Sequence, residues 1–442
     1  MAQDSSRRRA RNPFITVILL SVLVRVVLWV IYEPIEYSDS GAYLRLGELL
    51  LDFSLNGYDG SRVPGYPLFI ALLRLDPQAI WFVQMSLGVL TAALLFWITW
   101  RTTGSPGASF IVGGVQAVFP ATVLFEANLL TETLTFFLIV LTLALLVAYR
   151  QSRIRTSKLV LAGLIGISAS LAGLVRPIFF PLTLWLVPFL WFAGGASPRQ
   201  RLSMLALFAV FPLLMQGGWL YFMRAHFHVI SPTAIGGYNM VQHSGEFFED
   251  LPDEYAVIRD VYIRYRDKQI IMRGSQNNAI WQAVPELTES SGMNFYELSR
   301  KLNELSWMLI REHPRGYLIN VIEGWFWFWK APVYWRADAL SGVLLQSVVR
   351  VWILLGRAVA LAANAAFLLV SVGALISRSV RNWVRIDAMS LFVGGFIWWT
   401  SILQSLFEHG DNPRFLVPLQ MIVIYFVVRS TYKFGHSLVK AR

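Results

Sequence analysis

The sequence contains no cysteine among its 442 residues. A disulfide, a thiolate zinc site and a cysteine nucleophile are therefore excluded. Charged residues are scarce too: they make up 15% of the chain, against roughly 25% in soluble domains. With 56% hydrophobic residues, the chain has too few charges to cover itself in water. A soluble domain, a disordered chain and a collagen-like chain are all excluded by this composition.

The sequence motifs of several soluble enzyme classes are absent as well. The sequence has no GxxxxGK[ST] loop, no HExxH pair and no GxSxG elbow. P-loop ATPase, zinc protease and α/β-hydrolase chemistry therefore have no support.

Long apolar runs dominate what is present. Most have the length of about 17–25 residues that an α-helix needs to cross a bilayer. They cover residues 13–32, 79–100, 108–125, 131–149, 158–175, 177–194, 202–222, 348–376, 387–406 and 414–431. The sequence thus predicts an all-α polytopic membrane protein with about ten transmembrane helices. A run at 64–75 would reach only about 18 Å as a helix and is predicted to stay at the membrane surface.

The net charge of +11 comes largely from short loops between the apolar runs. Such loops are cytoplasmic when they are rich in Lys and Arg. With 64–75 at the surface, all the basic loops fall on one side: Arg7–Arg11, Arg101, Arg150–Lys158, Arg199–Arg201, Arg378–Arg385 and Lys440–Arg442. Both termini are therefore predicted inside, in a plasma (inner) membrane, and no nucleic-acid partner is expected.

This topology divides the chain into three parts. Residues 1–222 form an N-terminal transmembrane module that includes the first outer loop, 33–78. Residues 223–346 form an extracytoplasmic, interfacial region with helix-period stretches at 253–268 and 294–312, and residues 347–442 return to the membrane. The aromatic residues of 325–335 are typical of an interfacial belt.

Charged or Gly/Pro-rich clusters mark the outer ends of most spans. They are Glu36–Asp39, Arg62–Pro67, Glu126–Glu132, Arg176–Pro177, Ser231–Glu246 and Glu408–Arg414. Ionisable groups at membrane depth are costly and usually line a cavity or pair with each other. We therefore expect one outward-facing site at the membrane boundary.

The first of these clusters suggests acid–base chemistry. Glu36, Asp39 and Tyr43 are spaced to share one face of a helix. Asp39 also precedes Ser-Gly-Ala in the manner of a helix N-cap. A capping role and a catalytic role for Asp39 both remain open at this point.

Three arginines, Arg62, Arg176 and Arg414, each lie close to a proline at an outer span boundary. Singly, each is explained by snorkelling to the headgroups. Together they form a candidate anion clamp, because guanidinium groups match phosphate oxygens. Lys330, among tryptophans, is a further candidate.

The remaining candidates for substrate contact lie in the same outer clusters. Glu126 and Glu132, in a turn expected to be external, suit ion pairing with an arginine better than a divalent cation such as Mg²⁺ or Mn²⁺. The others are Tyr66, Gly237, Tyr238, Asn239, His243 and Glu408. His243 lies beside carboxylates, and the Gly-Gly-Tyr-Asn turn permits a close approach to a ligand.

In order along the chain, these motifs resemble those of the GT-C superfamily of integral-membrane glycosyltransferases. The likeness is to the bacterial relatives of the protein O-mannosyltransferases and of the aminoarabinose transferase. The segments that carry it are Glu36–Tyr43, Arg62–Phe69, Leu130–Phe137, Gly173–Pro177, Pro232–Asn239 and Asn412–Pro418, within about residues 33–420.

The resemblance implies an enzyme that moves a hexose or pentose from a polyprenyl-phosphate donor, with inversion. The acceptor would be a hydroxyl of a glycan, lipid or protein at the outer leaflet, and the pathway one of envelope glycan biosynthesis. Asp39, with Glu36, would act as the base, while Arg62, Arg176, Arg414 and Lys330 would hold the phosphate. No cofactor is expected with certainty, and a divalent cation at Glu126 and Glu132 stays an alternative.

Two other classes remain as alternatives. An O-antigen ligase or polymerase would use the same donors, but its large loop would be expected to hold the essential Arg and His residues. A lipid or solute transporter would place ionisable residues near span midplanes and show inverted repeats. Arg25 is the main ionisable residue that the sequence places inside a span.

Overall fold

The computed structural model describes residues 2–192, 197–409 and 413–441. Almost all regular structure in these residues is helical, with an isolated bridge between Ile35 and Asn128. The helices are α1 (Ala2–Ile31), α2 (Ser40–Leu51), α3 (Gly65–Leu72), α4 (Pro77–Thr103), α5 (Pro106–Val118), α6 (Pro120–Phe125), α7 (Glu132–Gln151), α8 (Arg155–Val175), η1 (Pro177–Phe179), α9 (Leu182–Trp191), α10 (Pro198–Pro212), the π-helical η2 (Leu213–Gly217), α11 (Gly218–Phe227), α12 (Gly236–Ser244), η3 (Gly245–Asp250), η4 (Asp253–Tyr255), α13 (Ala256–Arg273), α14 (Ala279–Ser291), α15 (Phe295–Glu312), α16 (Pro314–Phe328), η5 (Ala337–Ala339), α17 (Val343–Ile376), α18 (Arg378–Val384), α19 (Ala388–Phe407), η6 (Pro413–Phe415) and α20 (Val417–Ala441).

The predicted all-α membrane fold is confirmed. In the described part of the chain, seven stretches are long and apolar enough to cross a membrane: Ala10–Ile31, Pro77–Thr103, Glu132–Gln151, Arg155–Val175, Pro198–Phe227, Val343–Ile376 and Ala388–Phe407. The other three predicted spans coincide with the shorter apolar helices Pro106–Val118 and Pro177–Trp191 and with α20. The count of ten therefore stays a prediction.

The ends of the spans follow local sequence signals. The Asp76 carboxylate accepts hydrogen bonds from the backbone N–H groups of Gln78 and Ala79 at the start of α4. Gly104 ends that helix with a φ of 71°. Such caps satisfy backbone groups that have no partner within the helix.

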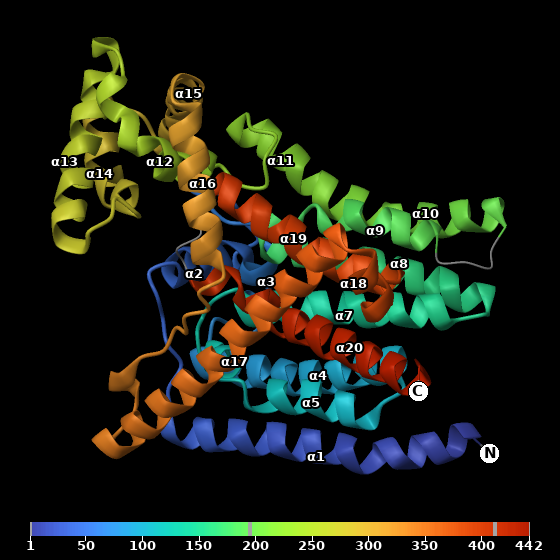
Figure 1. Cartoon of the computed structure of the whole chain (residues 1–442). Coiled ribbons are helices and arrows are strands. Elements are labelled where there is room, and N and C mark those ends of the chain that lie inside the picture. Colours follow the sequence, from blue (N-terminus) through green and yellow to red (C-terminus); the bar gives the residue numbers. More distant parts are fainter. Residues whose placement is uncertain (1, 193–196, 410–412, 442) are drawn as a thin grey trace.

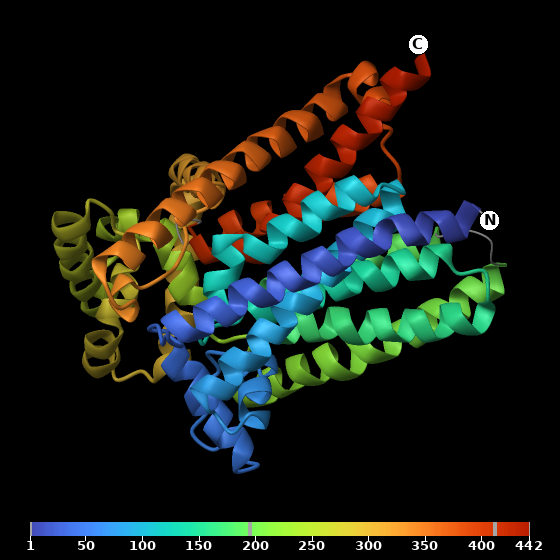
Figure 2. The same cartoon turned by 90° about the horizontal axis from the view of Figure 1, so that it is seen from below.

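Helices α12 to α15 gather at one end of the molecule, and both chain termini lie at the other end (Figures 1 and 2). This outer layer has its own apolar core, which includes Tyr238, Phe248, Leu298, Leu302 and Leu305. The helix-period stretches predicted at 253–268 and 294–312 are confirmed as α13 and α15. The three-part division of the chain remains a proposal.

The first outer loop is attached to the turn between α6 and α7. The backbone N–H of Ile35 donates to the Ala127 carbonyl at 2.8 Å, and the N–H of Leu129 donates to the Ile35 carbonyl at 3.0 Å. The Ser40 hydroxyl adds a hydrogen bond to the Leu129 carbonyl. These bonds hold the start of α2 beside the start of α7.

Helix α3 is too short to cross the membrane, since eight residues span about 12 Å. It packs on α2 and α8. At the crossing with α8, a Cβ atom on Gly65 would lie 2.6 Å from the Leu174 carbonyl oxygen. Only glycine fits there without a backbone shift.

Replacing Gly65 with alanine is expected to push α3 away from α8 and to lower the free energy of unfolding by about 1–3 kcal/mol, as overpacking does. The measurement is the thermal unfolding midpoint of the detergent-purified protein. Gly41→Ala on α2 is the control, because nothing lies within 4 Å of a Cβ at that position. Equal midpoints for the two variants would contradict the close packing at Gly65.

Candidate active site

Asp39 directly precedes α2, and two arginines hold its carboxylate. Nη2 of Arg62 donates to Oδ1 at 2.8 Å, and Nη1 of Arg414 donates to Oδ2. Asp39 occupies the N-cap position of α2, but its side chain makes no capping hydrogen bond. Of the two roles left open for Asp39, capping by its carboxylate is therefore excluded, because the arginines take both oxygens.

Glu132 is the first residue of α7, and its side chain is fully buried. Its Oε1 accepts hydrogen bonds from Nη1 of Arg176 and from Nε of Arg414, each at 2.8 Å. Its Oε2 is buried and has no hydrogen-bond partner. Arg414 thus contacts both carboxylates and joins the two ion pairs into one network. We call these five side chains, Asp39, Arg62, Glu132, Arg176 and Arg414, the arginine cluster.

Exposure changes steadily across the arginine cluster. Side-chain exposure is 32% for Asp39 and 18% for Arg62, then 11% for Arg414, 9% for Arg176 and 0% for Glu132. Asp39 and Arg62 therefore form the open end, and Glu132 forms the closed end. Three guanidinium groups against two carboxylates leave a formal charge of +1, which favours an anionic ligand.

The arginines also determine the protonation of Asp39. Burial by itself raises the pKa of the Asp39 carboxyl, but the charges of Arg414 and Arg62 outweigh burial and hold that pKa below its usual range. In this arrangement Asp39 is ionised and is a weak base.

A pair of tyrosines, Tyr43 and Tyr66, lies beside Arg62. The guanidinium carbon of Arg62 lies 5.2 Å from the centre of the Tyr43 ring, and the Tyr43 and Tyr66 rings meet edge to face at 5.3 Å. The Tyr66 hydroxyl donates to Oε1 of Gln84 at 3.3 Å. Tyr43 and Tyr66 are buried, and the Tyr43 ring is the one that contacts the Arg62 guanidinium.

The turn from Glu126 to Glu132 is buried throughout, which corrects the expectation of an external turn. Gln84 donates to the carbonyls of Glu126 and Asn128. Glu126 pairs with Arg25 of α1 at 2.5 Å, and both side chains are at most 4% exposed. Burying the turn requires these partners, since unpaired polar groups are costly in an apolar interior. Arg25 interrupts the first apolar run, and this interruption is the sequence signal for the pair. The sequence does not indicate that Arg25 and Glu126 are partners.

Two residues predicted to act with Asp39 and the arginines make no contact with the cluster. Glu36 is exposed and lies before α2 begins. It therefore does not share a helical face with Asp39 and Tyr43, and that expectation is wrong. Lys330 is exposed, with its Nζ 3.0 Å from the centre of the Trp327 ring.

Gly237, Tyr238 and Asn239 belong to the outer layer. A Cβ on Gly237 would lie 1.7 Å from the Ser299 carbonyl oxygen, so glycine permits α12 to pack on α15. The Tyr238 hydroxyl donates to the Phe295 carbonyl at 2.7 Å. Asn239 is half-buried. The packing of this loop accounts for its glycine and its tyrosine.

His243 is fully buried, and neither ring nitrogen has a hydrogen-bond partner. Its ring centre lies 5.9 Å from that of His409. Burial, together with the charge of His409, lowers the pKa of His243 to about 3, so it is neutral at neutral pH. Glu408 accepts a hydrogen bond from Gln404 at 3.1 Å. Asn412, part of the last motif, lies outside the described residues.

The carboxylates of the cluster contact guanidinium groups. Among the described residues, no three His, Asp or Glu side chains converge in a way that would suit a metal ion. Glu132 pairs with two of the predicted arginines, Arg176 and Arg414, whereas Glu126 pairs with Arg25. The divalent cation stays untested.

Neither a model of a protein family nor a curated protein matches the chain. Solved structures do. The oligosaccharyltransferase AglB of Archaeoglobus fulgidus, in complex with an inhibitory peptide and a dolichol-phosphate, aligns with a TM-score of 0.50 and 12% identity over 99% of this chain and 52% of that one. The chain has the GT-C fold.

Two further GT-C structures are similar to a lesser degree. An Archaeoglobus fulgidus oligosaccharyltransferase tethered with an acceptor peptide aligns with a TM-score of 0.48 and 12% identity, over 98% of this chain and 53% of that one. ArnT from Cupriavidus metallidurans, bound to undecaprenyl phosphate, aligns with a TM-score of 0.39 and 14% identity, over 96% and 79%. The present chain spans about half the length of the oligosaccharyltransferase chains that it matches.

Glu132→Gln is expected to lower the free energy of unfolding by about 3 kcal/mol. It leaves Arg176 and Arg414 buried without the charge that compensates them, and breaking a buried ion pair costs about this much. The measurement is the thermal unfolding midpoint.

The control for this change is Asp253→Asn, which removes an ion pair of Arg259 at a residue that is 97% exposed. Its midpoint is expected to stay close to that of the wild type. A Glu132→Gln midpoint equal to that of the control would show that the cluster does not depend on this charge.

Proposed function

We propose that the protein is a membrane glycosyltransferase that moves a sugar from a polyprenyl-phosphate donor to an acceptor hydroxyl. The observation that carries the proposal is the arginine cluster. Arg62, Arg176 and Arg414 come from three distant parts of the chain and converge, with a net positive charge, beside one partly exposed carboxylate. A phosphate and a nucleophilic hydroxyl need this combination of groups.

The reaction is a displacement at the anomeric carbon. The acceptor oxygen forms a bond to that carbon, while the bond from the carbon to the phosphate oxygen breaks. Asp39 takes the proton of the acceptor hydroxyl, and the leaving phosphate keeps the electron pair. The guanidinium groups stabilise the negative charge that grows on the phosphate, as preorganised donors do in other transferases. A single displacement inverts the configuration.

Donor binding makes Asp39 a stronger base in this mechanism. Without donor, Arg62 and Arg414 occupy both oxygens of Asp39 and hold its pKa low. A bound phosphate competes for the same guanidinium groups and draws them from Asp39. Its carboxylate then accepts a proton more readily, which links base strength to the presence of the donor.

Helix α2, which directly follows Asp39, lies on the side of the molecule that holds the outer layer, away from the two termini (Figures 1 and 2). With the termini in the cytoplasm, as the basic loops predict, this end is extracytoplasmic and the enzyme is a multi-pass protein of the inner membrane. Arg25, the residue that favoured a transporter, is paired with Glu126, so it offers no free charge for transport. No observation favours a ligase or polymerase over the proposed transferase.

Asp39→Asn is expected to lower the transfer rate by at least about 100-fold, the usual contribution of a general base. Donor binding is expected to persist, because the arginines remain. The measurements are turnover and donor affinity of the purified protein. Asp52→Asn, at the exposed end of α2, is the control. Full activity of Asp39→Asn would exclude Asp39 as the base.

Arg62→Ala is expected to weaken donor binding about 10-fold, since one charge-assisted hydrogen bond to the phosphate is lost. Arg62 is tested because it has one ion-pair partner and lies at the open end of the cluster. Arg259→Ala, in the outer layer, is the control. Wild-type donor affinity in Arg62→Ala would remove this arginine from the phosphate site.

The proposed activity is tested most broadly with a panel of radiolabelled polyprenyl-phosphate sugars, with and without EDTA. Transfer from at least one donor to an acceptor hydroxyl is the expected result. Loss of transfer with EDTA, restored by Mg²⁺ or Mn²⁺, would establish that transfer requires a divalent cation. Failure to bind any polyprenyl phosphate would contradict the proposal.

A further inference from the structure

Asp39 lies in a short turn that two hydrogen bonds close. The Ser40 backbone N–H donates to the Tyr37 carbonyl at 2.9 Å, and the Tyr37 N–H donates to the Ser40 hydroxyl oxygen at 2.9 Å. The same hydroxyl donates to the Leu129 carbonyl at 2.9 Å. The place of Asp39 therefore depends on where Tyr37 and Ser40 are held.

The ring of Tyr37 belongs to a stack of three aromatic rings, with Tyr334 in the middle. The centre of the Tyr334 ring lies 5.3 Å from that of Tyr37, with 25° between the planes, and 5.7 Å from that of Phe125, with 12° between the planes. Aromatic pairs at this separation attract each other beyond the apolar area that they bury. Phe125 is buried and directly precedes Glu126. Tyr334 thus links the turn of Asp39 to the buried turn from Glu126 to Glu132.

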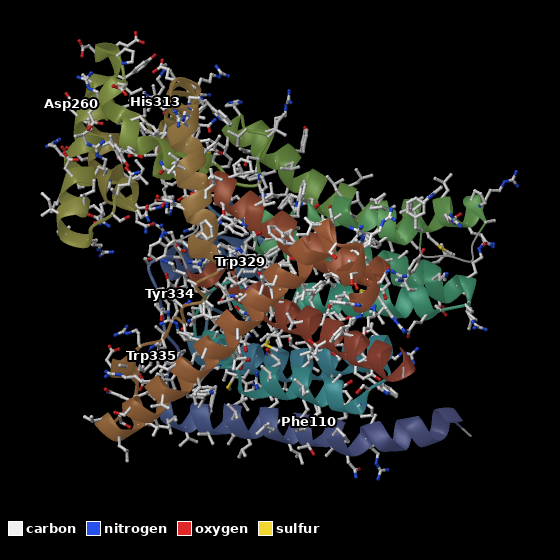
Figure 3. The ribbon with its side chains drawn as sticks, viewed as in Figure 1. Phe110, Asp260, His313, Trp329, Tyr334 and Trp335 are labelled. Carbon is white, nitrogen blue, oxygen red and sulfur yellow. The ribbon has the colours of Figure 1, made fainter. Side chains whose placement is uncertain are left out.

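The connection between α16 and α17, which carries Tyr334, is fixed on both sides of this residue. The Trp329 carbonyl accepts a hydrogen bond from Nδ2 of Asn364 at 3.0 Å. The Arg336 backbone N–H donates to the Tyr32 hydroxyl at 2.8 Å. Figure 3 shows Tyr334 on this connection. A fixed segment of this kind can hold a second part of the chain in place.

The side chain of Tyr37 is held by its ring and not by its hydroxyl. The hydroxyl oxygen is buried and has no hydrogen-bond partner. Tyr334 is half-buried, and its ring covers that of Tyr37. Loss of the Tyr334 ring would therefore remove a contact that the Tyr37 hydroxyl does not replace.

The stack matters most when the donor is bound. In the proposed mechanism the phosphate draws Arg62 and Arg414 from Asp39, so the ion pairs no longer hold its carboxylate. Contacts without charge must then keep the carboxylate directed at the acceptor hydroxyl. A displacement of about 1 Å in such a group can lower a rate about 100-fold.

We propose that Tyr334 is a positioning residue for Asp39. Its ring, between Tyr37 and Phe125, holds the turn of Asp39 against the buried turn while the donor occupies the arginines. Tyr334 does not touch the reacting atoms and acts through Tyr37. This inference rests on the proposed function and adds a residue that the arginine cluster does not contain.

The test uses the full chain in phosphatidylcholine nanodiscs, with the radiolabelled polyprenyl-phosphate sugar that gives the highest wild-type transfer. Tyr334→Leu is expected to lower kcat about 10-fold or more. KM for the donor is expected to stay within about 2-fold of the wild type, because the arginines are unchanged. Tyr334→Phe, which keeps the ring, is expected to recover most of the rate. Tyr296→Leu is the control, since it removes a half-buried ring that packs on Phe227 at 5.4 Å in the outer layer.

A wild-type kcat in Tyr334→Leu would overturn the inference and leave the proposed function intact. An equal loss of kcat in Tyr296→Leu would also overturn it, because the loss of any ring contact would then slow the enzyme. Absence of transfer by the wild type would instead contradict the proposed function.

A second measurement needs no turnover. Because the chain has no cysteine, Ser38→Cys can carry a single nitroxide label at an exposed position within the turn. With undecaprenyl phosphate added, the electron paramagnetic resonance spectrum of this label is expected to show a larger mobile fraction in Tyr334→Leu than in Tyr334→Phe. Equal spectra for the two variants would show that the Tyr334 ring does not hold the turn.

Discussion

The contact of Arg414 with both Asp39 and Glu132 is the interaction on which the site depends. It joins the loop before α2, the start of α7 and the segment before α20. Each carboxylate would be costly to bury alone, and so would each guanidinium group. Their mutual pairing lets five ionisable side chains lie together at one end of an apolar bundle. The same pairing leaves a surplus positive charge beside the carboxylate that reaches the open end.

The cluster is held in place by backbone and amide contacts and by one further ion pair. The bridge between Ile35 and Asn128 attaches the first outer loop to the buried turn, and Gln84 holds two carbonyls of that turn. The Arg25–Glu126 pair fixes the turn to α1 from inside the bundle. Catalytic groups act efficiently when rigid surroundings fix their geometry. Here the rigid part is a buried turn that would otherwise leave polar backbone in an apolar environment.

The all-α membrane fold could be predicted from the sequence, because apolar run length and the placement of Lys and Arg are set by the bilayer. The arginines near prolines and the Asp39 motif could also be selected, since charge at an outer span boundary is unusual. The pairing could not be predicted. Nothing local in the sequence indicates that Glu126 faces Arg25 while Glu132 faces Arg176. The Gly-Gly-Tyr-Asn turn shows a different difficulty. Its glycines suggest a close approach to a ligand, whereas the structure explains Gly237 by the packing of α12 on Ser299.

In the proposed mechanism, the cluster exchanges its internal ion pairs for a lipid phosphate. The most direct test is an electron cryomicroscopy structure of the protein with undecaprenyl phosphate in nanodiscs. We expect phosphate density between Arg62 and Arg414, with the Asp39 carboxylate separated from both guanidinium groups and open to an acceptor. Phosphate density away from these arginines, with Asp39 still bound to both of them, would contradict this mechanism.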